Sequence, residues 1–442
     1  MRLTSTASSR RAVPFDRPLL LCGLLSSVVV IEPAPVDLLL VGLSTIWLVG
    51  QRLRIPALGA GLGLAYVAMS VISQLIGQAN GYALDARIVR DILIEGYLVL
   101  ACVALFAKFS TDRNAIRSFF TGVVLGAVIV SSTFLVLRVV GRVPDIFFRD
   151  EFRSRVRGLF KDPNVLGPFL VMPILPLLVR NEIVKIPFAK VAAIPCTVLL
   201  MLTFSRGAYV AFAVALFVLG AAMFVRERIT YSQAAIAVVG MTGVLGVAAL
   251  LWGSASGPVT SDLIEASGLV NTNRLGLQAY DTERFATNFN AWAYVVDNPF
   301  GNGIQAFARQ AGLNPHNLFL GKAVDAGLAA AILVVAVPTV AMGRALFART
   351  DMPRFAAITS AALAGTMAVS TVIHSHHWRH LFFITAVAFA ISARARMKGS
   401  DLDLRDPTEF TGDATNTSVG ASLTHQQPLL TYRPNTNTSR GG

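Results

Sequence analysis

Long apolar runs recur along this chain, and they constrain its fold more than any other feature. Hydrophobic residues make up 54% of its 442 residues and charged residues only 14%, and the mean hydropathy is +0.61. A soluble domain carries charge on about a quarter of its residues. Each run is close to the ~20 residues that a helix needs to cross a bilayer. The sequence therefore predicts an all-α polytopic membrane protein.

The runs predict about twelve membrane-spanning helices. Candidate spans cover residues 18–31, 36–50, 57–76, 88–107, 119–140, 164–180, 188–204, 207–225, 232–252, 318–343, 355–373 and 379–394. The first two are short, and Glu32-Pro33-Ala34-Pro35 between them predicts a tight break. A secretory signal peptide is the alternative for residues 1–31, but no small-x-small cleavage site follows its apolar stretch.

The distribution of lysine and arginine predicts the orientation. With a cytoplasmic N-terminus over residues 1–17, every inner loop is basic, as short cytoplasmic loops are. This predicts a multi-pass protein of the cytoplasmic (inner) membrane, with its membrane domain over residues 18–397. A large outer loop, 253–317, then lies between the ninth and tenth spans. Residues 398–442 are rich in Thr, Asn, Asp and Gly, which predicts a disordered cytoplasmic tail.

The charge distribution indicates which partners the chain binds, and the cysteine positions indicate whether disulfides or thiolate metal sites form. The net charge of +13 is spread over loops, whereas a nucleic-acid binder would gather it on one face of a soluble fold. We therefore expect membrane lipids, and no nucleic acid, as partners. Cys22, Cys102 and Cys196 all lie inside apolar runs, so neither a disulfide framework nor a thiolate metal site is indicated.

The stretch RDEFRSRVRGLFKDPN, residues 149–164, departs from the charge bias. It holds four arginines and a lysine, and the predicted orientation puts it outside. One interpretation is that these arginines bind lipid headgroups or pair with Asp150, Glu151 and Asp162. The other is a cradle for an anionic substrate, to which Arg157 and Lys161 would contribute.

Three helices are predicted to begin at the same outer side. Their starts are Asp162-Pro163, Ser205-Arg206-Gly207 and Asn314-Pro315-His316, each a polar residue near a helix start. A helix N-terminus is partly positive, so it favours phosphate and disfavours an arginine that has no anion nearby. Arg206 therefore either meets an anion or snorkels to the interface.

The same dipole acts differently on His316. It disfavours the imidazolium, so the ring stays neutral near pH 7 and can accept a proton. A satisfied interfacial histidine is the alternative interpretation.

The outer loop contains a predicted amphipathic helix. Phe285, Phe289, Trp292 and Val296 recur at helical spacing, which predicts an apolar stripe that rests on the membrane surface or on other helices. Arg284 and Asn288 run beside the stripe.

These motifs together resemble the O-antigen ligase and polymerase family of membrane glycosyltransferases. The matching segments are RGLFKDPNVLG (157–167), FSRGAYVAF (204–212), ERFATNFNAWAYVVDNPFGNGIQAF (283–307) and NPHNLFL (314–320). The resemblance implies that Arg206 and Arg284 contact the pyrophosphate of an undecaprenyl-pyrophosphate-linked glycan. It also implies that His316 serves the hydroxyl of a glycan or glycolipid acceptor.

The residue types suit this chemistry. The leaving lipid pyrophosphate develops negative charge that arginines stabilise without a metal or other cofactor, and a neutral histidine can take the acceptor's proton. Direct displacement inverts the anomeric centre, whereas retention needs two carboxylates about 5 Å apart, and the outer loops contain no convincing pair.

Other hypotheses stay open. A polymerase of the same family would transfer to a second lipid-linked glycan, and the motifs do not identify the acceptor. A transporter or flippase for an anionic lipid-linked molecule would also use arginines that face a cavity. We expect no charged residues in the middle of the spans, however, and this hypothesis leaves His316 without a role. In HSHHWRH, residues 374–380, His376 and His380 have a metal-binding helical spacing. An aromatic and basic interface belt explains that cluster equally well.

Overall fold

The computed structural model describes residues 15–50, 57–148, 155–227 and 279–403, apart from His374 and His376. The predicted ninth span, 232–252, and most of the tail lie outside these residues, as do Asp150 and Glu151. Within the described ranges the chain is helical and forms no strand, with two isolated bridges that pair Val29 with Phe160 and Phe148 with Val156. The predicted all-α fold is confirmed for this part of the chain.

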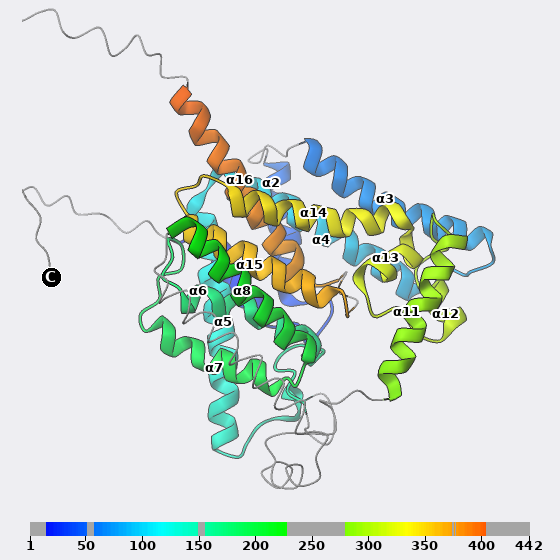
Figure 1. Ribbon diagram of the computed structural model, residues 1–442, viewed down its shortest axis with the longest axis horizontal. Helices are drawn as coiled ribbons and strands as arrows, with labels where there is room; N and C mark the ends of the chain where they lie inside the picture. The colour runs from blue at the N-terminus through cyan, green and yellow to red at the C-terminus, as the bar shows by residue number, and fades with distance from the viewer. Residues whose placement is uncertain are drawn as a thin grey trace, which may run out of the picture. The chain divides into compact units, whose positions relative to one another are not determined.

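The described residues contain fourteen α-helices, and Figure 1 labels all of them except α1. They are α1 (Arg17–Leu25), α2 (Pro35–Val49), α3 (Ala57–Ala79), α4 (Ala86–Thr111), α5 (Arg113–Val139), α6 (Pro163–Leu178), α7 (Ala189–Leu202), α8 (Arg206–Glu227), α11 (Ala279–Asp297), α12 (Ala306–Ala311), α13 (Leu318–Ala326), α14 (Leu328–Phe347), α15 (Pro353–Ser370) and α16 (Arg379–Asp403).

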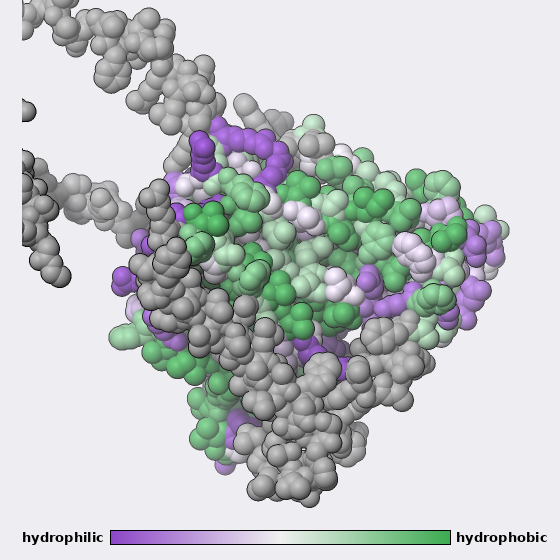
Figure 2. Space-filling view, in the orientation of Figure 1, coloured by the Kyte–Doolittle hydropathy of each residue, from purple (hydrophilic) through white to green (hydrophobic). Residues whose placement is uncertain are grey.

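Six of these helices are long and apolar enough to cross a membrane: α3, α4, α5, α8, α14 and α16. Helices α2, α6 and α7 are apolar but shorter. Large hydrophobic side chains also face outward, among them Leu64, which is 72% exposed, and Leu93, which is 65% exposed. Hydrophobic residues spread over the outer surface of α3 and α14 in Figure 2. Such a surface is solvated by lipid tails rather than by water, so the chain is a helical membrane protein.

Side-chain caps explain where several helices begin. The Asp162 carboxylate accepts a hydrogen bond from the backbone N–H of Asn164 at 2.7 Å, and Pro163 takes the first helical position of α6. Ser205 accepts from the N–H of Ala208 at 3.3 Å at the start of α8. Both helices therefore begin where the sequence predicts.

The predicted tenth span, 318–343, is wrong as a single helix. Gly327 separates α13 from α14 and has a φ of +87°. A side chain there would meet the carbonyl carbon of Phe300 at 2.6 Å, and the N–H of Leu328 donates to the Pro299 carbonyl at 2.8 Å. The turn at 298–303 thus packs into the break, which requires glycine. Helix α13 is a short separate helix, and α14 is the membrane-crossing one.

Close backbone packing holds the centre of the bundle. A Cβ on Gly122 of α5 would collide with the Leu20 carbonyl oxygen of α1, so the two helices touch along their small residues. Beside this contact, Phe109, Phe119 and Phe120 form tilted and edge-on ring pairs in the buried core. Helices α8 and α15 form the other extensive pair.

Contacts between loops divide the helix ends into two groups. The first, which we call the site face, comprises residues 26–34, 80–85, 140–148, 155–162, 203–206, 298–317, 371–373, 375, 377 and 378. Within it Asn80 bonds Asn302 at 2.7 Å, Arg309 pairs with Asp85 at 2.7 Å, and the N–H of Val29 donates to the Leu159 carbonyl at 2.7 Å.

The second group, the opposite face, comprises residues 108–118, 180–188 and 344–354 together with Asp16, Arg226 and Arg394. Arg113 pairs with Asp351 at 3.2 Å, Arg226 donates to the Pro353 carbonyl at 2.9 Å, and Arg394 donates to the Ser110 carbonyl at 3.3 Å. Each contact in either group joins loops that the sequence predicts on the same side of the membrane.

This division predicts how introduced cysteines react with an impermeant maleimide in intact cells. Cysteines at Leu84 and Phe300, on the site face, should label alike, and those at Arg180 and Arg349 should label only after permeabilisation. The native Cys22 and Cys196 are buried, and Cys102 is partly buried within the membrane-crossing α4, so the wild type serves as the background control. If the cysteines at Leu84 and Arg349 were labelled under the same condition, the division into two faces would be contradicted. If only the cysteines at Arg180 and Arg349 were labelled in intact cells, the orientation alone would be contradicted.

Candidate functional site

Arg155 links the starts of two helices on the site face. Its Nε donates to the Thr203 carbonyl at 3.1 Å, and its Nη2 donates to Oδ1 of Asn164 at 2.8 Å. Thr203 precedes α8, and Asn164 lies in the first turn of α6. The guanidinium is thereby held between two partly positive helix N-termini, where it is half-buried. Sequence reasoning did not single out Arg155, because four arginines in one stretch look alike without their contacts.

Arg206 occupies the first position of α8, as predicted. It follows Phe204, whose backbone φ of +46° turns the chain sharply out of α7, and the buried Ser205. The turn is fixed further by Tyr209, whose hydroxyl donates to the Met201 carbonyl at 2.7 Å. The side chain of Arg206 therefore starts from a rigid corner.

The segment that carries His316 is anchored on both sides. The N–H of His316 donates to Oδ1 of Asn288 from α11 at 3.1 Å. The next residue, Asn317, caps α13 by accepting from the N–H of Leu320 at 3.0 Å. The Nδ2 of Asn317 also donates to the Thr371 carbonyl at 2.9 Å. The histidine thus lies where α11, α13 and the end of α15 meet.

The end of α15 brings the two segments toward each other. Thr371, which receives the bond from Asn317, directly follows α15. On the same helix end, Val369 and Ile373 lie against Gly207, the second residue of α8, where a Cβ would meet them at 2.6 and 3.1 Å. Segments 205–207 and 316–317 therefore contact the same turn of the chain, although they are far apart in sequence.

Helix α11 places its predicted stripe outward. Phe289 and Val296 are 77% and 68% exposed, as a stripe that faces the membrane surface would be, while the Trp292 ring lies 6.5 Å from that of Phe319 in α13. Both predicted surroundings therefore occur along the stripe. The buried face carries Thr287, Ala291 and Val295 instead. Arg284 lies in the first turns of this helix, and its side chain lies outside the described part of the structure.

Arg157 and Lys161 lie at the edge of the arginine-bearing segment. The Nε of Arg157 donates to the Ile146 carbonyl at 3.1 Å in an exposed position. Lys161 is half-exposed and forms an ion pair with Glu32. The carboxylate of Asp162 caps α6, and Asp150 and Glu151, the other predicted partners of the arginines, lie outside the described residues.

A buried ionic cluster holds α13 against α3 and α4. Lys322 is fully buried, pairs with Glu95 of α4 and donates to Ser70 of α3 at 3.1 Å. Sequence reasoning expected no charges in the middle of the spans, and this is wrong for Glu95, which is 1% exposed. A charged residue eight or nine positions into an apolar run gives a weak signal, and its partner Lys322 is distant in sequence.

A second group joins the same helices. The Asp325 carboxylate accepts from the backbone N–H of Gln305 at 2.9 Å, and the Nε2 of Gln305 donates to Asp91 at 3.0 Å. Ser73 of α3 donates to the Asp325 carbonyl at 2.7 Å. Nearby, the N–H of Ile88 and the charge of Arg309 lower the pKa of the Asp85 carboxyl from its ordinary value. Helix α13 is thus tied to α3, α4 and the 303–309 segment.

The structure describes only part of the histidine-rich stretch after α15. Helix α16 begins at Arg379, and His376, one of the two histidines of the predicted metal-binding alternative, lies outside the described residues. Arg379 makes a buried bidentate pair with Asp37, at 2.6 and 2.5 Å. The buried ring of His380 packs on Trp378 and Phe169. In the described ranges no three histidine, cysteine or acidic residues are grouped as a metal site would need.

Comparison with known proteins assigns no family to the chain. No protein-family model and no curated protein sequence matches the chain.

The buried pair predicts a large stability effect. Lys322→Ala leaves Glu95 charged and unpaired in an apolar interior, which should cost about 3–5 kcal/mol of unfolding free energy. Thermal unfolding of the purified protein in detergent measures it. Lys108→Ala is the matched control, because its pair with Asp112 is half-exposed and is worth less than about 1 kcal/mol. The double variant Lys322→Met with Glu95→Leu should recover most of the loss, and equal losses in both single lysine variants would contradict the assignment.

Proposed function

We propose that this protein is a membrane glycosyltransferase of the O-antigen ligase type. It transfers a glycan from undecaprenyl pyrophosphate to an acceptor at the outer side of the cytoplasmic membrane. The site face is then extracytoplasmic, both termini are cytoplasmic, and the chain crosses the membrane about twelve times. One observation carries the proposal: Arg155, Arg206 and the His316 segment converge on the helix starts of α6 and α8 and the end of α15.

The donor's pyrophosphate binds between the starts of α6 and α8. Two helix N-termini and the guanidinium groups of Arg155 and Arg206 supply positive charge there, and charge-assisted hydrogen bonds to phosphate are the strongest kind. Arg284 of α11 adds a further contact from the loop helix. Arg157 and Lys161 line the outer edge, where Lys161 exchanges its exposed pair with Glu32 for phosphate.

His316 acts as the general base. The acceptor's hydroxyl oxygen attacks the anomeric carbon as its proton passes to the imidazole, and the bond from that carbon to the pyrophosphate oxygen breaks. The bonds from Asn288 and Asn317 hold the histidine segment in one place, which such a transfer requires. A positioned base contributes about 10²–10⁴-fold to the rate.

The arrangement of carboxylates favours an inverting displacement. A retaining enzyme uses one carboxylate as nucleophile and a second about 5 Å away as acid. In the described part of the chain, the buried carboxylates of Asp37 and Glu95 pair with Arg379 and Lys322. Those of Asp325 and Asp91 accept hydrogen bonds from the backbone and side chain of Gln305. A carboxylate engaged in this way is a poor nucleophile, so the direct route through His316 is preferred.

The acceptor distinguishes two activities that share this site. A ligase transfers to a glycolipid, and a polymerase of the same family transfers to a second lipid-linked glycan. Both need the same donor cradle and the same base. Reconstitution with a lipid-pyrophosphate glycan and each acceptor class in turn identifies which product forms.

A transporter or flippase is the second candidate, and the buried ionisable groups favour it. Intramembrane charges such as Glu95 and Lys322 often mark transport pathways. Here they are closed against each other, and they tie α13 to α4 rather than line an open path. Purified protein in vesicles separates the two hypotheses, because a transferase forms a new covalent product and a transporter only moves its substrate across the bilayer.

Substitutions at the site should separate donor binding from chemistry. Arg206→Ala removes a charge-assisted contact from ground and transition states alike, so donor affinity should fall about tenfold or more and the rate with it. Arg206→Lys should recover only part, because lysine lacks the paired donors of a guanidinium. His316→Ala should lower the transfer rate by about 10²-fold or more while the donor still binds.

Donor affinity and initial rate are measured on the same purified proteins. Arg142→Ala is the matched control, since Arg142 is an exposed arginine on the same face and should leave both values unchanged. A wild-type rate for His316→Ala would remove the base assignment. If Arg206→Ala and Arg142→Ala lost donor affinity equally, the effect would come from the overall charge of the face and not from a specific contact between Arg206 and the pyrophosphate.

The proposal also predicts that turnover survives chelation. Arginines rather than a divalent cation neutralise the leaving pyrophosphate, so transfer by the purified protein should keep its rate in excess EDTA. Loss of activity in EDTA that Mg²⁺ or Mn²⁺ restores would contradict the arginine mechanism.

A further inference from the structure

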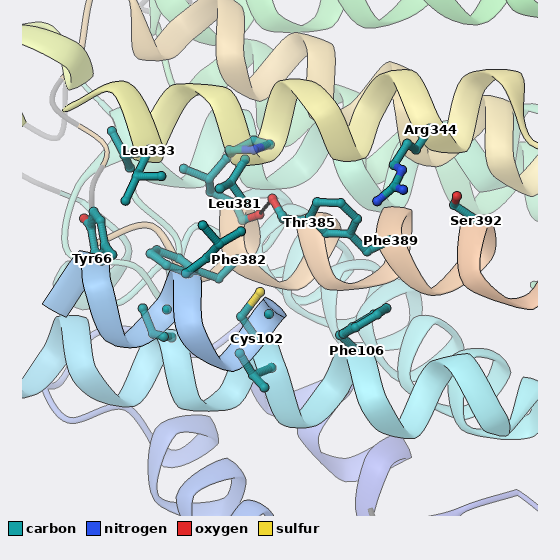
Figure 3. Close-up of a pocket in the computed structure, with 18 of the residues that line it drawn as sticks. Tyr66, Cys102, Phe106, Leu333, Arg344, Leu381, Phe382, Thr385, Phe389 and Ser392 are labelled. Atoms are coloured by element: carbon teal, nitrogen blue, oxygen red, sulfur yellow. Dashed lines mark hydrogen bonds between the residues drawn. The ribbon is translucent and has the colours of Figure 1, made fainter. Parts of the chain in front are cut away.

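A cavity of about 330 Å³ lies between α3, α4, α14 and α16, away from the site face (Figure 3). Its walls are almost entirely apolar, with Leu333 from α14, Phe382 and Phe389 from α16, and Cys102 and Phe106 from α4. All four helices are membrane-crossing by length and composition. A cavity of this lining within the bilayer suits a hydrocarbon chain.

One end of the cavity is basic. Arg344 of α14 and Arg396 of α16 line it together with Ser392, and Figure 3 shows Arg344 and Ser392 at the end away from Tyr66 and Leu333. Both arginines are exposed, and neither forms an ion pair with the residues that the structure describes. Arg344 lies in the last turn of α14, at the opposite face. An anion is therefore the expected neighbour.

The depth of the cavity matches one leaflet. Leu333 and Arg344 are eleven residues apart on α14, which is about 16 Å at ~1.5 Å per residue. Half of a ~30 Å hydrocarbon core is about the same length. An amphiphile with its head at Arg344 would thus reach the middle of the membrane with its chain.

We propose that this cavity binds an anionic phospholipid from the leaflet at the opposite face. One acyl chain occupies the apolar cavity, and the phosphate contacts Arg344, Arg396 and the Ser392 hydroxyl. Basic pockets between membrane helices recruit anionic headgroups in this way. A zwitterionic headgroup would bring its own cation toward the two arginines. The donor's polyprenyl chain suits the site less, because its pyrophosphate is proposed to bind at the other end of the helices.

The inner end of the cavity reaches the support of α13. Tyr66 lines that end, and the ammonium of Lys322 lies 4.8 Å from the centre of its ring. Lys322 is the residue that pairs with Glu95. A bound acyl chain therefore packs against the ring that covers the buried ion pair, and lipid occupancy should raise the thermal unfolding midpoint.

Native mass spectrometry of the full-length protein in detergent tests the site, with phosphatidylglycerol and phosphatidylcholine as probes. The wild type should bind phosphatidylglycerol in preference, and Arg344→Gln with Arg396→Gln should weaken that binding by at least about tenfold. The matched control is Arg180→Gln with Arg349→Gln, which removes the same charge from the same face outside the cavity and should keep the affinity.

A second pair of variants tests the chain. Gly59 lines the cavity and Gly61 does not, and a Cβ at either meets no atom within 4 Å. Gly59→Phe should lower lipid binding and cancel the lipid-dependent rise in the unfolding midpoint, whereas Gly61→Phe should change neither. Equal binding of phosphatidylglycerol and phosphatidylcholine would overturn the proposal, as would equal effects of the two pairs of arginine substitutions. It would also be overturned if a polyprenyl phosphate competed for the cavity more strongly than phosphatidylglycerol does. Glycan transfer is not measured in either experiment, so the outcome is independent of the proposed function.

Discussion

Lys322 and Glu95 bring opposite charges into an interior that is otherwise apolar, and the arrangement of the site depends on their pairing. A buried charge without a partner is strongly unfavourable in a membrane protein, so the pair fixes α13 against α4, and Ser70 adds α3. The His316 segment leads directly into α13. The position of the candidate base is therefore set by an ion pair whose lysine lies six residues further along the chain.

Breaks in helices create the site, and polar contacts keep them closed. Gly327 separates α13 from α14, and the 298–303 turn packs into the gap. At the other corner the chain turns sharply between α7 and α8, and Arg155 joins this corner to α6. Inside a membrane, freed backbone groups need partners within the protein. Those partners are what gather helix N-termini, arginines and a histidine on one face.

The proposed lipid site and the proposed transfer site use opposite ends of the same bundle. At the site face, arginines converge on helix starts where an anion is electrostatically favoured. At the opposite face, Arg344 and Arg396 flank an apolar cavity between α14 and α16. The Tyr66 ring lies between that cavity and Lys322, so the bundle provides a physical contact from the bound lipid chain to the support of the histidine segment.

The sequence by itself determined the helical membrane class, because apolar runs of this length have no soluble alternative. It also determined the starts of α6 and α8, because the caps formed by Asp162, Pro163 and Ser205 depend only on neighbouring residues. The tertiary structure alone decided the break at Gly327, the exposure of the α11 stripe and the partners of Lys322, Arg379 and Lys161. It also gave Arg155 its contacts with the starts of α6 and α8. These features depend on residues far apart in the chain, whose contacts no local pattern encodes.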